Sequence, residues 1–180
     1  MSRALLAAGR GSAYCLAILP LSLVAVAAAL LGRAGTAAGW WSRMRERVLG
    51  VPSLPPIGRV TAAALLGHAL LSMLLGVAAL VPLGIELLMV LRGLLYGLVD
   101  RGPYDHSWGG PSMAGAWLAH FAVGIPFTVV AALALIGIAA VHQRLTTALA
   151  GQPRAPWLVP VALMTPLPAI AFFLAWLHQI

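Results

Sequence analysis

Two histidines, an aspartate and three aromatic residues lie close together between residues 104 and 120. The binding or sensing candidates are Tyr104, Asp105, His106, Trp108, Trp117 and His120. Because the ordinary pKa of imidazole is ~6.5, His106 or His120 could take up a proton or hold a ligand near neutral pH. A metal ion would need His106, His120 and Asp105 to converge without a recognised ligand spacing, so we expect no metal site.

The same stretch has a simpler structural interpretation. Gly109 and Gly110 permit backbone angles that are closed to other residues, and Pro111 suits the first position of a helix. The sequence therefore predicts a tight structural turn that leads into a helix. On that helix Trp117 and His120 would share one face, so a ligand or proton site between loop and helix is the alternative.

Polar residues also lie inside apolar stretches. His68 and Ser72 are four residues apart and would share a helix face. An ionisable group at membrane depth is a functional candidate, because an unpaired charge is costly there. We expect a neutral His68 that is hydrogen-bonded to a neighbouring helix. His120 could make the same kind of bond, since Ala116 and Gly124, one turn away on either side, would let another helix approach closely.

The chain carries no recognised signature of catalysis. It has no Ser-His-Asp order with an oxyanion turn, no His-Glu-x-x-His, no phosphate-binding loop and no paired intramembrane aspartates. Ser107 beside His106 does not make a nucleophile and base by adjacency alone. We therefore predict that the protein is not an enzyme and that it has no catalytic residue and no cofactor.

The elements that position these residues follow from composition. The chain has 180 residues, of which 62% are hydrophobic and 8% charged, with eleven Arg, no Lys and four acidic residues. Its mean hydropathy of +0.98 excludes an ordinary soluble domain. The arginines lie singly or in short groups, so we predict no nucleic-acid partner. The single Cys15 supports no disulfide framework.

Four stretches are long enough to cross the ~30 Å hydrocarbon core as helices. They are Ser12–Leu31, Val60–Val81, Ser112–Val141 and Pro156–His178. We predict an all-α, polytopic membrane bundle of about four transmembrane helices with short interfacial helices. It would form one integral membrane domain over residues 1–180, in a cell membrane. The first helix resembles a secretory signal, but its length and the Arg33 that follows favour an uncleaved helix.

Arginine placement predicts the orientation of these helices. The Arg33–Arg59 loop holds five arginines, whereas the Asp100–Pro111 loop holds one arginine and two acids. The positive-inside rule places the first loop in the cytoplasm and the second outside. The Arg144–Arg154 loop then returns to the cytoplasm and both termini lie outside. That arrangement puts Arg3 and Arg10 on the unfavoured side.

Residues 83–99 allow three arrangements. They are apolar apart from Glu86, Arg92 and Tyr96, and could extend the second helix past Pro82, lie in the interface or form a fifth span.

An internal similarity favours four spans. Residues 41–52 and 142–153 match at Arg43/Arg144, Gly50/Gly151 and Pro52/Pro153, and Pro55/Pro156 keep the same offset. Each reads as a short basic helix that a glycine ends. If both basic arms are cytoplasmic, an even number of spans must separate them.

The Tyr104–His120 stretch, YDHSWGGPSMAGAWLAH, resembles the sensor domain of actinobacterial membrane proteins, which is often fused ahead of a histidine kinase. The segments Arg92–Asp100 and Leu49–Pro52 are also similar to that family. The resemblance covers residues 11–151, and it does not explain the additional C-terminal helix at 156–178.

This resemblance implies a sensory or accessory membrane module in two-component signal transduction. Because the chain holds no kinase, it implies a separate sensor histidine kinase as partner. Two other interpretations stay open. One is a small transporter or channel subunit that forms a homo-oligomer, with His68, Glu86 and His120 lining a polar path. The other is a remnant of a sensor kinase that has no present ligand.

Overall fold

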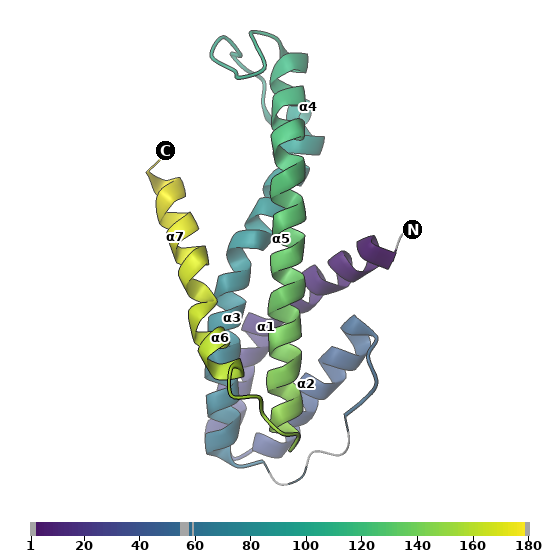
Figure 1. Ribbon diagram of the computed structural model, residues 1–180, viewed down its shortest axis with the longest axis vertical. Coiled ribbons are helices and arrows are strands. Elements are labelled where there is room, and N and C mark those ends of the chain that lie inside the picture. Colours follow the sequence, from purple (N-terminus) through teal and green to yellow (C-terminus); the bar gives the residue numbers. More distant parts are fainter. Residues whose placement is uncertain (1–2, 55–57, 59, 179–180) are drawn as a thin grey trace. The chain divides into compact units, whose positions relative to one another are not determined.

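The computed structural model describes residues 3–54, 58 and 60–178, and these residues form helices and loops with no strand. The helices are α1 (Arg3–Leu30), α2 (Ala34–Leu49), α3 (Ala62–Leu88), the π-helix η1 (Met89–Leu94), α4 (Tyr96–Val99), α5 (Met113–Leu149), α6 (Leu158–Met164) and α7 (Pro166–Leu177) (Figure 1). The predicted all-α class is therefore confirmed.

In the part of the chain that the structure describes, four helical stretches are long and apolar enough to cross a membrane, as the sequence predicted. They are Arg3–Leu30, Ala62–Leu94, Met113–Leu149 and Leu158–Leu177. Each also leaves large apolar side chains exposed, such as Leu16, Leu70, Val130 and Leu174. Exposed apolar surface on this scale suits contact with lipid. These features define a multi-pass membrane protein.

Residues 83–94 extend the second span, residues 96–99 form the short helix α4, and no separate fifth span is found among the described residues. α3 continues without interruption through Pro82, although a proline cannot donate to the Ala78 carbonyl one turn earlier. The π-helix follows directly, with Leu95 N–H bonded to the carbonyl of Val90 five residues back. This arrangement is one of the three that the sequence allowed, and it keeps the number of candidate spans at four.

The C-terminal span is broken where the sequence predicted one helix over Pro156–His178. α6 ends at Met164 and α7 begins at Pro166. Pro166 has no N–H to continue the helical ladder, so it begins a new helix. The Thr165 hydroxyl donates to the carbonyl of Val161 at 2.7 Å and so closes the last turn of α6.

The chain divides into two compact units. One comprises residues 1–81 and 135–180, and the other residues 82–134. In the first unit, α1 and α2 form a helical hairpin whose contacts are mostly between alanines. The hydrophobic core that this hairpin shares with α3 consists of Ala25, Ala28, Ala29, Ala34, Ala37, Trp41, Leu65 and Ala69. Small residues let the helix backbones approach closely, which is the main source of contact between helices in lipid.

Arg10 lies beside the end of α2, which belongs to the first basic arm. Its Nη1 donates to the carbonyl of Leu49 at 3.4 Å. The cause is the hairpin, because α2 runs back along α1 and returns its end to the first part of α1. A cation suits the end of a helix, where carbonyl groups lack helical partners.

Both basic arms end in the predicted glycine. Gly50 (φ +67°) follows α2, and Gly151 (φ +86°) follows α5. Both backbones adopt the left-handed conformation that favours glycine. The second arm is not a separate helix, however, because α5 continues from Val141 to Leu149 without a break. Pro55, from the internal similarity, and Arg59, from the predicted basic loop, lie outside the described residues.

A close contact between α1 and α3 depends on Gly76. A Cβ atom at this position would lie 2.9 Å from Cβ of Leu19 and 3.0 Å from its Cα. Gly67, on the same helix, has no such neighbour within 4 Å. Alanine substitutions at Gly76 and Gly67 therefore separate the effect of packing from the effect of helix propensity.

We predict opposite effects of alanine at these two glycines. Gly76→Ala should lower the free energy of unfolding by ~1–3 kcal/mol, because the added methyl group meets the α1 backbone. Gly67→Ala should be neutral or raise it by up to about 1 kcal/mol, because alanine favours the helix. Unfolding of the purified variants in mixed detergent micelles measures both. Equal effects at the two positions would show that the α1–α3 contact is wrong.

Candidate functional site

The loop before α5 folds on itself through hydrogen bonds to Asp100. The Tyr104 hydroxyl donates to the Asp100 carbonyl at 3.0 Å, and Gly102 N–H donates to the Asp100 carboxylate at 3.1 Å. Asp105, His106 and Trp108 are exposed, and 90% of the Trp108 surface is accessible. Three of the predicted sensing residues therefore lie at the surface of the loop.

The predicted turn is present, but Pro111 is not the first residue of the helix. α5 begins at Met113, because the Ser112 hydroxyl accepts a hydrogen bond from Gly115 N–H at 3.1 Å and caps the helix. Gly110 has φ +90°. A Cβ atom on Gly109 would overlap the carbonyl of Gly115. The two glycines thus let the loop fold closely against the start of α5.

Three of the predicted sensing residues contact the segment around Gly93 and Tyr96, at the end of the second span. They are Tyr104, Trp117 and His120. Trp117 Nε1–H donates to the Gly93 carbonyl at 2.7 Å. The His120 ring packs on Tyr96 with 4.7 Å between centroids, and the Tyr104 ring lies 6.3 Å from that of Tyr96. Tyr96 is therefore the centre of this aromatic group.

His120 does not make the hydrogen bond across a helix pair that the sequence suggested. Its Nδ1 lies 2.8 Å from the carbonyl of Ala116 in its own helix. The expected close approach of another segment is present, since a Cβ on Gly124 would meet the sulfur of Met89. The contact of His120 with that segment is ring packing on Tyr96. Among the described residues, no three His, Cys, Asp or Glu side chains could hold one metal ion.

A second polar site, which the sequence analysis did not identify, lies in the other unit. The Tyr14 hydroxyl of α1 is 2.7 Å from Nδ1 of His142 in α5. Nε2 of the same imidazole is 3.0 Å from the Ser72 hydroxyl of α3. All three side chains are fully buried. We call Tyr14, His142 and Ser72 the three-helix relay.

The hydrogen bonds of the relay assign its protons. The Ser72 hydroxyl donates to the carbonyl of His68 at 2.7 Å, which uses its one proton. Ser72 must then accept from His142, so the imidazole carries its proton on Nε2. Nδ1 is left as an acceptor, and the Tyr14 hydroxyl donates to it. The network is complete with a neutral histidine.

His68 is packed against the relay without being part of it. Its ring lies 5.4 Å from that of His142 and 5.2 Å from that of Trp41. Its Nε2 and the Trp41 Nε1 are buried without a hydrogen-bond partner. The expected hydrogen bond from the His68 ring to a neighbouring helix is therefore absent at Nε2. Ser72, expected on the same face, bonds to the His68 backbone instead.

Trp41 connects the relay to α2. Its side chain is completely buried, and its ring lies 4.9 Å from that of His142. Glu86 is partly buried in α3 and belongs to the unit of His120, not to that of His68. The three residues proposed to line a polar path are thus divided between the two units.

The sequence contains evidence for part of the three-helix relay. His142 lies two residues before Arg144 in the predicted second basic arm, and Tyr14 lies within the first apolar stretch. Together with Ser72 they are polar groups inside three different candidate spans. Listing the hydrogen-bonding side chains inside the predicted spans selects Tyr14 and Ser72 but not His142, which directly follows the predicted end of its span at Val141.

Comparison with known proteins gives no relative. No protein-family model, no curated protein and no solved structure matches the chain.

We predict strong coupling between Tyr14 and His142. Tyr14→Phe should lower the free energy of unfolding by ~1–3 kcal/mol, because Nδ1 of a buried histidine loses its donor. In a His142→Phe background the same change should cost much less, as a double-mutant cycle in detergent micelles will show. Tyr104→Phe, which removes a hydroxyl in the other unit, is the control and should add independently. Additive costs for Tyr14 and His142 would rule out the relay.

Proposed function

We propose that the protein is a non-catalytic sensory or accessory module of the cell membrane. It passes an external or bilayer signal to a separate partner such as a histidine kinase. The observation that carries the proposal is the three-helix relay, which joins α1, α3 and α5 and contacts α2 through Trp41.

The relay gives such a module a physical means of responding. A shift of any one of the three helices breaks a buried hydrogen bond and leaves a polar group unpaired, which is costly. Packed helices therefore change between discrete arrangements instead of deforming smoothly. Because Trp41 is fully enclosed beside both histidines, a rearrangement of the relay must move α2 as well.

α2 also supplies an exposed surface through which a partner could bind and respond to the movement of this helix. Arg43 and Arg47 are exposed on this helix, whereas Trp41 faces the core. Exposed arginines suit acidic protein surfaces and anionic lipids. The resemblance of Tyr104–His120 to a sensor domain that is often fused to histidine kinases supports a kinase as the partner.

A small oligomeric transporter or channel subunit is the second candidate. The observation in its favour is the relay itself, because hydrogen-bonded Tyr, His and Ser chains in a membrane can pass protons. Conduction needs access from water at both ends, however, and Tyr14, Ser72 and His142 have no accessible surface. The burial of the relay favours coupling of helices over transport.

We predict that a histidine kinase copurifies with the full chain from detergent extracts of its native membranes. Arg43→Gln/Arg47→Gln should lower its recovery several-fold, because the exposed basic surface of α2 is removed. Arg92→Gln/Arg101→Gln removes two exposed arginines from the other unit and should leave recovery unchanged.

Two results would contradict the sensory proposal. One is equal loss of the kinase in both double variants, or no kinase with the unaltered chain. The other is proton flux through vesicles that contain the purified protein and its abolition by His142→Phe, which would establish the transporter instead.

A further inference from the structure

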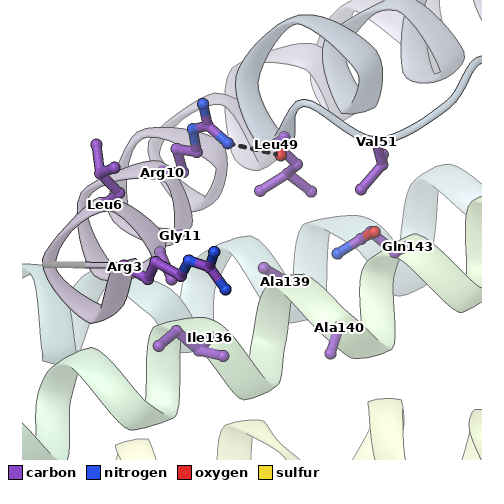
Figure 2. A pocket seen from close by; sticks show the side chains of 11 residues that line it. Arg3, Leu6, Arg10, Gly11, Leu49, Val51, Ile136, Ala139, Ala140 and Gln143 are labelled. Carbon is purple, nitrogen blue, oxygen red and sulfur yellow. Dashed lines mark hydrogen bonds between the residues drawn. The ribbon is translucent and has the colours of Figure 1, made fainter.

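A cavity of about 400 Å³ lies between the first part of α1, the end of α2 and α5. All the residues that line it belong to the unit of the three-helix relay. They are Arg3, Leu6, Ala7, Arg10, Gly11, Leu49, Val51, Ile136, Ala139, Ala140 and Gln143. Figure 2 shows the side chains of Arg3 and Arg10 extending from α1 toward the other two elements.

The polar part of this cavity is positively charged. Arg3 and Arg10 are seven residues apart on α1, which places them two turns apart on one face. No carboxylate is among the lining residues. Arg10 uses one N–H on the Leu49 carbonyl at 3.4 Å, and a guanidinium has five. Gln143 adds an amide. An anion with several acceptor oxygens suits this set of donors.

The rest of the cavity is apolar. Ile136, Ala139 and Ala140 form one wall on α5, and Leu49 and Val51 form another beyond the end of α2. Gly11 brings α1 close to the α5 wall, since a Cβ on it would lie 3.5 Å from Cγ1 of Ile136. A small anion would not contact these apolar walls, and an apolar molecule would not bind the arginines. An amphiphile would do both, with its charged group on the arginines and its apolar part on the walls.

We propose that this cavity binds an anionic phospholipid, with the phosphate held by Arg3 and Arg10 and the start of an acyl chain lying on Ile136, Ala139 and Ala140. The position fits this ligand, because the cavity opens beside helices whose outer faces suit lipid. Basic pockets between transmembrane helices bind lipid headgroups in this way. The bound lipid would contact α1, α2 and α5 together.

The test measures the thermal stability of the purified full chain in a neutral detergent with three probes. They are a short-chain phosphatidic acid, the matching short-chain phosphatidylcholine and inorganic phosphate. Phosphatidic acid should raise the melting temperature at concentrations at which the other two have little effect, because it alone offers both an anionic phosphate and acyl chains.

Variants then locate the site. Arg3→Gln/Arg10→Gln should weaken the response to phosphatidic acid by roughly tenfold or more. Arg92→Gln/Arg101→Gln removes the same charge from the other unit, where neither arginine lines this cavity, and should preserve the response. Ala140→Phe keeps both arginines and α2 intact but fills the apolar wall, and should weaken it as well.

Three outcomes would overturn the proposal. An equal response to inorganic phosphate would identify a free-phosphate site. An equal response to phosphatidylcholine would show that the arginines are not used. Equal weakening by both arginine pairs would show a general effect of charge. None of these outcomes depends on a kinase partner, so they leave the proposed sensory function untouched.

Discussion

His142 forms hydrogen bonds with Tyr14 and Ser72, and the arrangement of helices in the unit of residues 1–81 and 135–180 depends on these two bonds. Helices made of Leu, Ala and Val gain little from associating with one another in lipid, because lipid tails are equally apolar. Close packing and a few polar contacts must then set which faces meet and at what height. One imidazole that is bonded on both sides to different helices fixes α1 and α3 against α5 at a single level.

The packing of the other parts of this unit is consistent with the relative height at which His142 holds α1, α3 and α5. Gly76 lets α3 approach the backbone of α1, and Cys15 donates to the Leu135 carbonyl close to the relay. The alanines of α1 leave room for α2 to fold back, which encloses Trp41 beside the histidines. The same return of α2 brings Leu49 to Arg10 and forms the charged cavity. The basic arm, the relay and the cavity are therefore parts of one packed assembly.

The sequence predicted what local patterns determine. Long apolar stretches define the spans, and Gly50 and Gly151 follow the ends of α2 and α5, because both features depend on neighbouring residues only. The predicted third span ends at Val141, where the apolar run ends, whereas helical hydrogen bonding continues to Leu149. The Tyr14–His142 bond joins residues 128 positions apart, and no local pattern specifies such a partner. The aromatic group around Tyr96 likewise needs tertiary packing that spacing does not show.

The most direct measurement concerns the two sides of the membrane, because a module that carries a signal across it needs its loop and its basic arms on opposite faces. In a Cys15→Ser background, Ser107→Cys and Ser53→Cys are treated separately with a membrane-impermeant maleimide. If the loop is external and the basic arms are cytoplasmic, Ser107→Cys is labelled in intact cells and Ser53→Cys only after lysis. Labelling of Ser107→Cys only after lysis would contradict this arrangement, since the loop before α5 would then lie in the cytoplasm.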